Sequence, residues 1–300
     1  MIEIIHLKII REIDKQKSMT AAAKTLCLTQ PALSHSIKKL EQMFNIHIWE
    51  KKGRYLEFTP AGQHLLSLAN RILPQIEYSE DYLKKYAHGD MGSLRIGMEC
   101  HPCYQWLLKV ISPYLKEWPG IDVDVKQKFK FGGIGALFNY EIDILITPDP
   151  LLKAGLCFEP VFNYEQVLVV PHNHPFRSLP YIKASQMASE TLISYPVETN
   201  RLDIYSMFLT PHNISPKQHK IIESTDIILQ MVENGRGVTA LPHWFVEENK
   251  KRFNIASVRL GKHGIAKKLF IGIRKSDQQI KYLKAFIALS KKISFSFSTK

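Results

Sequence analysis

Hydrophobic positions in the first 45 residues recur every three or four residues, which is the spacing of amphipathic helices. The first predicted helix covers residues 3–17, and Ser18 or Thr20 can cap a short, alanine-rich second helix. A tight turn follows, and Pro31 then stands near the start of a third helix, where its missing N–H costs nothing. This order of elements predicts a helix-turn-helix. The apolar faces consist of Ile4, Leu7, Ile10, Ile13, Leu33, Ile37 and Leu40.

Polar residues cover the opposite face of the third predicted helix, which in a helix-turn-helix lies in the major groove of DNA. Two short apolar runs, residues 46–49 and 55–58, flank a Lys-Lys-Gly-Arg segment and predict a two-stranded wing with a basic tip. The alternative is a small three-helix bundle with a solvated polar face, which helical periodicity alone fits equally well. The candidate DNA contacts are Thr29, Gln30, Pro31, Ser34, His35, Lys38, Lys51, Lys52 and Arg54.

A longer helix is predicted after the wing, with Thr59 as its N-cap and Pro60 in its first turn. Its apolar residues form one seam, and Pro74 within the helix can kink it. Because a helix-turn-helix usually binds DNA as a two-fold pair, the sequence favours pairing of this seam between subunits. The alternative is that the seam packs on its own chain. The seam consists of Leu65, Ala69, Ile72, Ile76 and Leu83.

Beyond a polar linker with two glycines, residues 88–93, short apolar runs alternate with helix-like stretches, which predicts an α/β fold. Two lobes are expected, with the chain crossing near residues 162–166 and returning near 262–268. Ligands of such folds bind at strand ends against helix N-termini. The predicted strands are 94–98, 121–125, 142–147, 167–170, 191–194, 220–223, 238–241 and 268–273, and the predicted helices are 104–117, 201–209, 226–233 and 278–291. The predicted domains are 1–59, a linker and dimerisation helix at 60–88, and 89–300, with lobe I at 92–162 and 267–295 and lobe II at 163–266.

Composition indicates a class of partner and a cellular compartment. The 300 residues carry 40 Lys and Arg against 28 Asp and Glu, a formal net charge of +12 that favours a polyanionic partner. The sequence contains neither a membrane-length apolar segment nor a secretory leader. Four cysteines in such a chain do not form a disulfide framework, so we expect a reducing cytoplasm and no membrane association. The cysteines are Cys27, Cys100, Cys103 and Cys157.

Residues 21–62 resemble the signature of LysR-type transcriptional regulators. The resemblance implies a winged helix-turn-helix at the N-terminus and a C-terminal, type 2 periplasmic-binding-protein-like domain of two lobes that binds a small-molecule effector. VLVVPHNHPF and VENGRGVTALP resemble family landmarks of the second lobe. Lys51 departs from the usual Arg of the wing, which keeps the charge but loses a bidentate phosphate contact. The matching positions are Ala22, Ala23, Leu26, Gln30, Pro31, Ala32, Ser34, Ile37, Leu40, Glu41, Phe58, Thr59, Ala61 and Gly62.

Three further stretches, GMECHPCYQWL, ISYPVETNRLDIY and LPHWFVEE, resemble the branch of this family that regulates methionine biosynthesis. That resemblance implies homocysteine as an amino-acid-like effector and promoters of methionine-pathway genes, with dyad-symmetric sites on double-stranded DNA. It also implies a homodimer or homotetramer that contacts RNA polymerase. No cofactor is expected. The alternative within the family is a response to another small anion or to thiol redox state.

The residues themselves also indicate an anion site. Residues 99–103 follow the first α/β strand and open a helix, whose free N–H groups attract a carboxylate, and Ser224 repeats this arrangement in the second lobe. Arg201 can clamp a carboxylate, and its alternative role is a structural salt bridge with Asp203 or another acid. The candidate effector-binding residues are Glu99, Cys100, His101, Cys103, Thr147, Tyr195, Arg201, Ser224, Thr225 and His243.

The Cys100-His101-Pro102-Cys103 segment permits three interpretations. The sequence favours small side chains that line a pocket, ahead of a redox pair with lowered thiol pKa and well ahead of a zinc site with three ligands. His172 and His174 resemble metal ligands but belong to a turn before Pro175. Because GxSxG, P-loop and HExxH motifs are absent, we expect no enzyme. An α/β enzyme with an accessory DNA-binding domain and a transport-type solute-binding protein are the alternatives from other classes.

Overall fold

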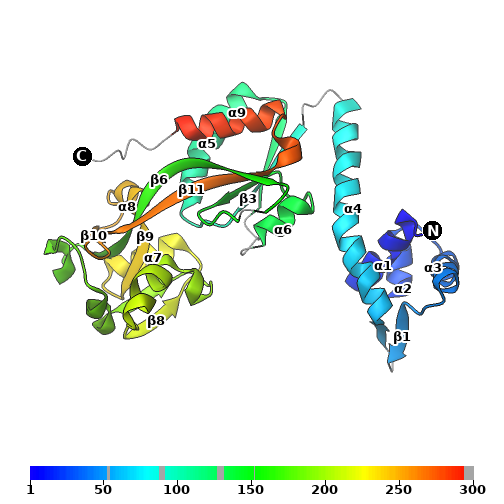
Figure 1. Cartoon of the computed structure of the whole chain (residues 1–300), viewed down its shortest axis with the longest axis horizontal. Coiled ribbons are helices and arrows are strands. Elements are labelled where there is room, and N and C mark those ends of the chain that lie inside the picture. The colour runs from blue at the N-terminus through cyan, green and yellow to red at the C-terminus, as the bar shows by residue number, and fades with distance from the viewer. Residues whose placement is uncertain (53–54, 88–91, 127–131, 152, 294–300) are drawn as a thin grey trace. The chain divides into compact units, whose positions relative to one another are not determined.

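The computed structural model describes residues 1–52, 55–87, 92–126, 132–151 and 153–293 (Figure 1). At the N-terminus, α1 (Ile4–Gln16), α2 (Met19–Thr25) and α3 (Gln30–Phe44) confirm the predicted helices. Ser18 accepts a hydrogen bond from the Ala21 N–H, and Thr29 accepts one from the Ala32 N–H, so both helices are capped as their sequences predict. The buried side chains Leu33, Ile37 and Leu40 form the inner face of α3.

The wing is a hairpin of β1 (Trp49–Lys52) and β2 (Tyr55–Phe58). The prediction of a first strand at residues 46–49 is wrong, because Ile48 is buried in the core and its N–H donates to the Glu41 carboxylate at 2.8 Å. Lys51 and Lys52 therefore belong to the strand and pair in register with Leu56 and Tyr55 rather than forming the tip.

The long helix α4 (Pro60–Ala87) begins where the Thr59–Pro60 signal predicts. Gly62 lets this helix lie directly against the wing, because a Cβ there would overlap the carbonyl oxygen of Ile48. Leu65 and Ala69 are buried against α1 of the same chain, so the expectation that the whole seam pairs between subunits is wrong for this half. Leu83, near the other end of the helix, is 64% exposed.

The C-terminal part is built on a mixed sheet with the strand order β4-β3-β5-β11-β6-β9-β7-β8 in the described residues, while β10 pairs with β6. Parallel pairing joins β3 to β5 and joins β7 to both β8 and β9. The sheet therefore has a parallel segment in each lobe. The strands are β3 (Gly92–Met98), β4 (Ile121–Lys126), β5 (Ile144–Thr147), β6 (Leu156–Pro171), β7 (Thr191–Ser194), β8 (Gln218–Ile221), β9 (Val238–Pro242), β10 (Ile255–Arg259) and β11 (Ile265–Arg274).

Two long antiparallel strands, β6 and β11, run through both lobes and connect them (Figure 1). The predicted crossings near residues 162–166 and 262–268 fall on or directly beside these strands, which supports the two-lobe prediction. The strand predicted at 167–170 is only the end of β6, and β10 was not predicted. The helices that cover the sheet are α5 (Cys103–Glu117), α6 (Gly133–Phe138), α7 (Thr225–Glu233), α8 (His243–Asn249) and α9 (Lys281–Lys292).

The predicted helix at residues 201–209 is replaced by short turns, namely a 3-10 turn η3 (Thr199–Arg201), a π-helical turn η4 (Ile204–Leu209) and a 3-10 turn η5 (Thr210–His212). Pro211 lies in the last of them. Because proline lacks an N–H and clashes with the preceding turn, a regular helix cannot continue past this last turn.

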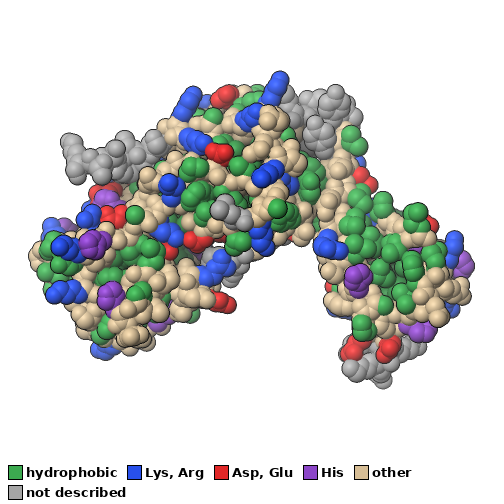
Figure 2. Space-filling model, in the orientation of Figure 1, with side chains coloured by type: hydrophobic (Ala, Val, Ile, Leu, Met, Phe, Trp, Pro, Cys, Tyr) green, Lys and Arg blue, Asp and Glu red, His purple; other side chains and the backbone are tan. Residues whose placement is uncertain are grey.

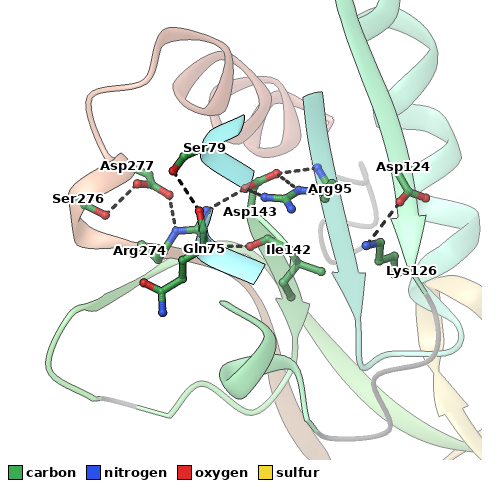
Figure 3. Close-up of polar contacts among 10 residues, drawn as sticks. All are labelled: Gln75, Ser79, Arg95, Asp124, Lys126, Ile142, Asp143, Arg274, Ser276 and Asp277. Carbon is green, nitrogen blue, oxygen red and sulfur yellow. Dashed lines mark hydrogen bonds and ion pairs between the residues drawn. The ribbon is translucent and has the colours of Figure 1, made fainter. Parts of the chain in front are cut away.

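A buried ion network holds the end of the first lobe's sheet at which β5 begins (Figure 3). The Asp143 carboxylate accepts hydrogen bonds from Arg95 and Arg274, with N–O distances of 2.8–3.0 Å, and Arg274 also pairs with Asp277. Asp143 precedes β5, whereas Thr147 ends that strand. The network therefore lies at the opposite end of β5 from the candidate effector residues, and its role is structural.

Candidate functional site

The outer face of α3 carries the residues predicted to contact DNA. Five of these predicted contact residues are exposed, and a sixth, Ser34, is half-buried. The exposed ones are Thr29, Gln30, Pro31, His35 and Lys38. The Thr29 hydroxyl accepts a hydrogen bond from the Ala32 N–H and so caps the start of the helix. Lys51 and Lys52 lie in the hairpin strand β1, and Arg54 lies outside the described residues. The structure thus presents one polar helix face, as a base-reading helix requires.

The first lobe brings Glu99 and Thr147 together where β3 and β5 end. The Glu99 carboxylate accepts a hydrogen bond from the Gly133 N–H at 3.0 Å and another from the Thr147 hydroxyl. A side chain at position 133 would overlap Leu145, so glycine permits this close backbone approach. Burial raises the pKa of Glu99, although the two hydrogen bonds and the positive charge of Arg201 oppose this effect.

The second lobe contributes an aromatic and hydroxyl surface. The Tyr195 hydroxyl hydrogen-bonds to the Thr225 hydroxyl at 2.9 Å, at the start of α7. The imidazole of His101, from the first lobe, stacks on the Tyr195 ring with centroids 4.4 Å apart. Ser224 caps α7 through its side chain. The structure therefore brings together His101 of the first lobe with Tyr195 and Thr225 of the second. All three are among the candidate effector-binding residues that the sequence analysis predicts.

A lysine that the sequence analysis missed links the lobes. The Lys267 ammonium donates to Asp149 at 2.8 Å and to Asp203 at 2.9 Å. Asp203 forms its ion pair with Lys267, and the positive charge of Arg201 acts on another acid, Glu99. Asp149 is in turn attached to the first-lobe group, since its N–H donates to the Thr147 hydroxyl. We call Glu99, Thr147, Asp149, Asp203 and Lys267 the inter-lobe cluster.

Three candidate residues differ from expectation. Cys100 and Cys103 form a disulfide, which matches the redox pair of the second interpretation rather than the favoured one, in which their small side chains line a pocket. Their bond closes the turn that leads from Glu99 into α5. His243 faces Glu247 on its own helix α8, with 3.1 Å between the His243 Nε2 and Glu247 Oε1 atoms, and none of its described contacts reaches the inter-lobe cluster.

Comparison with known proteins decides the family. The helix-turn-helix model of the LysR family, described as "Bacterial regulatory helix-turn-helix protein, lysR family", matches residues 4–63, and the LysR substrate binding domain model matches residues 87–293. The chain belongs to the LysR family. Membership makes it a transcription regulator that binds DNA, not an enzyme, and confirms both the predicted fold class and the predicted function class.

Individual LysR-family proteins resemble this chain over all or most of its length. The HTH-type transcriptional regulator MetR of Escherichia coli K12 is 38% identical over 287 residues, covering 96% of this chain and 89% of MetR. The regulatory domain of MetR from N. meningitidis is 31% identical, with a TM-score of 0.63 over 68% of this chain and 94% of that domain. Full-length CbnR, solved with its target DNA, shares the fold with a TM-score of 0.69 at 21% identity, covering 98% and 100% of the two chains.

Within this LysR regulator, the described residues contain no group of three or more His, Cys, Asp or Glu side chains arranged for a metal ion. His172 and His174 lie in the turn predicted for them, where His174 caps η1 (Pro175–Ser178). No described helix is long and apolar enough to cross a membrane. The missed cluster residues Asp149 and Lys267 carried no local signal, because 118 positions separate them in the sequence.

Proposed function

We propose that this regulator controls methionine-biosynthesis genes and responds to a small amino acid, with homocysteine as the effector. The observation that carries the proposal is the buried Glu99 carboxylate at the end of β3, whose pKa the positive charge of Arg201 lowers against the effect of burial. A carboxylate with a guanidinium in its vicinity would complement the ammonium and carboxylate of an amino acid. The similarity to MetR regulators over 96% of the chain supports the choice of pathway.

The remaining partners follow from the same proposal. The chain acts in the cytoplasm as a homodimer or homotetramer on dyad-symmetric sites and contacts RNA polymerase. Exposed Leu83 on α4 and the exposed face of α3 support this arrangement, because two-fold recognition needs a helix pair as well as a reading helix. No cofactor takes part, and the effector acts by favouring one arrangement of the two lobes.

Thermal unfolding of the full chain with L-homocysteine tests the effector. A ligand at ~100 times its dissociation constant stabilises the native state by roughly 2.7 kcal/mol, which is a visible rise in the unfolding temperature. Methionine, cysteine and O-acetylserine are the comparators, and 4-mercaptobutanoate tests the ammonium contact because it lacks only that group. We expect a saturable rise with homocysteine and a much smaller one with 4-mercaptobutanoate.

The matched variant is Glu99→Gln, which keeps acceptors for Gly133 and Thr147 but removes the charge. It should lose the preference for homocysteine over 4-mercaptobutanoate. A shift with another metabolite but none with homocysteine would leave the LysR regulator intact and remove homocysteine as the effector.

The Cys100–Cys103 disulfide favours thiol redox state as a second candidate signal. It directly follows Glu99, so its reduction would free the turn that positions this carboxylate. N-ethylmaleimide labelling after treatment with a reductant or an oxidant should show paired loss of these two thiols on oxidation. Equal labelling of both cysteines under the two treatments would rule out a redox response.

A further inference from the structure

A second pocket lies on the second lobe, away from the inter-lobe cluster. Its volume is about 540 Å³, which is within the range of small-molecule sites. Three segments build it: residues 181–185, the turns at 207–214, and the loop at 260–265 that leads into β11. None of the described residues that line it belongs to the inter-lobe cluster. We call it the second-lobe pocket.

The floor of the second-lobe pocket is apolar and preformed. Ile182, Phe208 and Leu260 line it and are at most 5% exposed, because they also belong to the hydrophobic core of this lobe. Met207 lines the same pocket and is 49% exposed, so apolar surface is left in contact with water. An apolar ligand body would cover this surface, and burial of apolar area is favourable by roughly 25 cal/mol per Å².

The rim of the pocket is basic. Lys183, Lys262, His212 and His263 line it, and none of its described lining residues is Asp or Glu. In the described part of the chain, no ion pair occupies either lysine. Neighbouring Arg259, by contrast, is neutralised by Glu165 at 2.8 Å. Figure 2 shows Lys and His side chains beside hydrophobic ones on this lobe, at the left of the view.

The backbone that lines the pocket includes a π-helical turn, which is a rare conformation. Met207 and Phe208 come from the π-helical turn η4, and His212 ends the following 3-10 turn. The His212 Nδ1 atom lies 2.8 Å from the Phe208 carbonyl oxygen, so Nδ1 carries the proton and orients the ring. Single π-helical turns occur frequently at functional sites, since they widen a helix and redirect its side chains.

We propose that the second-lobe pocket is a second ligand site, which takes an amphiphilic monocarboxylate. Its apolar part, a ring or a short alkyl chain, covers Phe208 and Met207, while its carboxylate meets Lys183 and Lys262. An amphiphilic cation is repelled by this rim, and a fully polar anion such as phosphate leaves the apolar floor exposed to water.

The elements that form the pocket also carry the inter-lobe cluster. Asp203 directly precedes η4, and Lys267 lies two residues after Ile265, which lines the pocket on β11. A ligand that fixes η4 and the start of β11 therefore acts on the elements that position the Lys267–Asp203 pair. This arrangement gives a second metabolite a route to influence the response of the same regulator.

Isothermal titration of the full chain with octanoate, octanol and octylammonium tests the proposal, because the three probes share a chain and differ in charge. We expect saturable octanoate binding and markedly weaker binding of the other two. The double variant Lys183→Gln/Lys262→Gln should weaken octanoate binding about tenfold, which corresponds to about 1.4 kcal/mol for the two exposed charge contacts together, and leave octanol unchanged. The matched control Lys217→Gln/Lys251→Gln removes two exposed lysines elsewhere on the lobe and should bind like the parent.

Three results would overturn the proposal: no saturable octanoate binding, equal binding of octanoate and octanol, or parent-like affinity in the Lys183/Lys262 variant. Sedimentation of the same samples tests whether a second copy of the chain occupies the pocket instead. If the double variant weakens self-association and octanoate competes with it, the pocket is filled by a second copy of the chain and the ligand proposal is wrong. Control of methionine-biosynthesis genes is assayed in a separate experiment. If that proposal fails, the octanoate titration still tests the second-lobe pocket.

Discussion

The buried carboxylate of Glu99 lowers the stability of the unliganded protein when it is charged. This carboxylate is held by the Gly133 N–H and the Thr147 hydroxyl, yet burial still raises its pKa. The folded protein therefore binds this proton more tightly than the unfolded chain does. A ligand ammonium beside the carboxylate would offset the free-energy cost of burying its charge. Such a site therefore prefers a ligand with a positively charged group.

The raised pKa of Glu99 predicts the sign of a pH effect. Its contribution to folding stability is greatest at low pH and declines as pH rises from its ordinary value of 4.5 through the raised one. Glu99→Gln removes the carboxylate, so this variant should unfold at a higher temperature than the parent at about pH 8, and the difference should shrink towards about pH 5. Thermal unfolding of both proteins across this range is the measurement. A difference that grows as the pH falls would contradict the assignment.

At the scale of single elements, α3 was predictable because everything that defines it is local. The Thr29 cap, Pro31 in the first turn and the spacing of Leu33 and Ile37 all lie within one helix. The first strand of the wing was placed too early, since its start depends on the burial of Ile48 and on a bond to Glu41, seven residues away. Local patterns therefore set the helices, whereas tertiary contacts set the strand ends.

The exposed face of α3 predicts two separable effects on DNA binding. His35→Ala should reduce the preference for the regulator's own operator over random DNA, because one base contact discriminates by about 1–3 kcal/mol. Lys38→Gln should instead weaken binding to both DNAs and lower the slope of log affinity against log salt by about 1. Fluorescence anisotropy of labelled operator and random duplexes measures both quantities.

Lys251→Gln is the control for this experiment, because it removes an exposed lysine from the second lobe. If His35→Ala discriminates operator from random DNA as well as the parent does, α3 is not the base-reading helix. A Lys38→Gln variant with an unchanged salt slope would remove Lys38 from the phosphate contacts.

At the scale of the whole α/β domain, the sequence predicted two lobes but not what holds them in one arrangement. Strand-helix alternation follows from local hydrophobic patterns, and the crossings near residues 162–166 and 262–268 were expected. The contacts between lobes join residues that are distant in sequence, such as Lys109 with Glu248 and Asn249 with Gln105. For Asp203, sequence proximity favoured Arg201, but tertiary structure supplied Lys267, 64 positions away.

Lys267 is the contact whose removal should change the domain most. Burial alone would lower the pKa of Lys267, but its bonds to Asp149 and Asp203 outweigh burial and raise the pKa, so the ammonium stays charged. Lys267→Met would leave the two carboxylates without their shared cation. We expect the free energy of unfolding to fall by about 2 kcal/mol at neutral pH, below the full cost of breaking a buried pair because Asp149 is 46% exposed.

The loss in Lys267→Met should be recovered in part by Asp203→Asn in the same chain, since that change removes the more buried of the two unpaired carboxylates. Lys268→Met is the matched control, because the neighbouring lysine on β11 is exposed. Urea unfolding of the four proteins measures the cycle. If Lys267→Met unfolds like Lys268→Met, the bridge does not stabilise the arrangement of the lobes, and an effector would have to act through other contacts, such as the His101–Tyr195 stack.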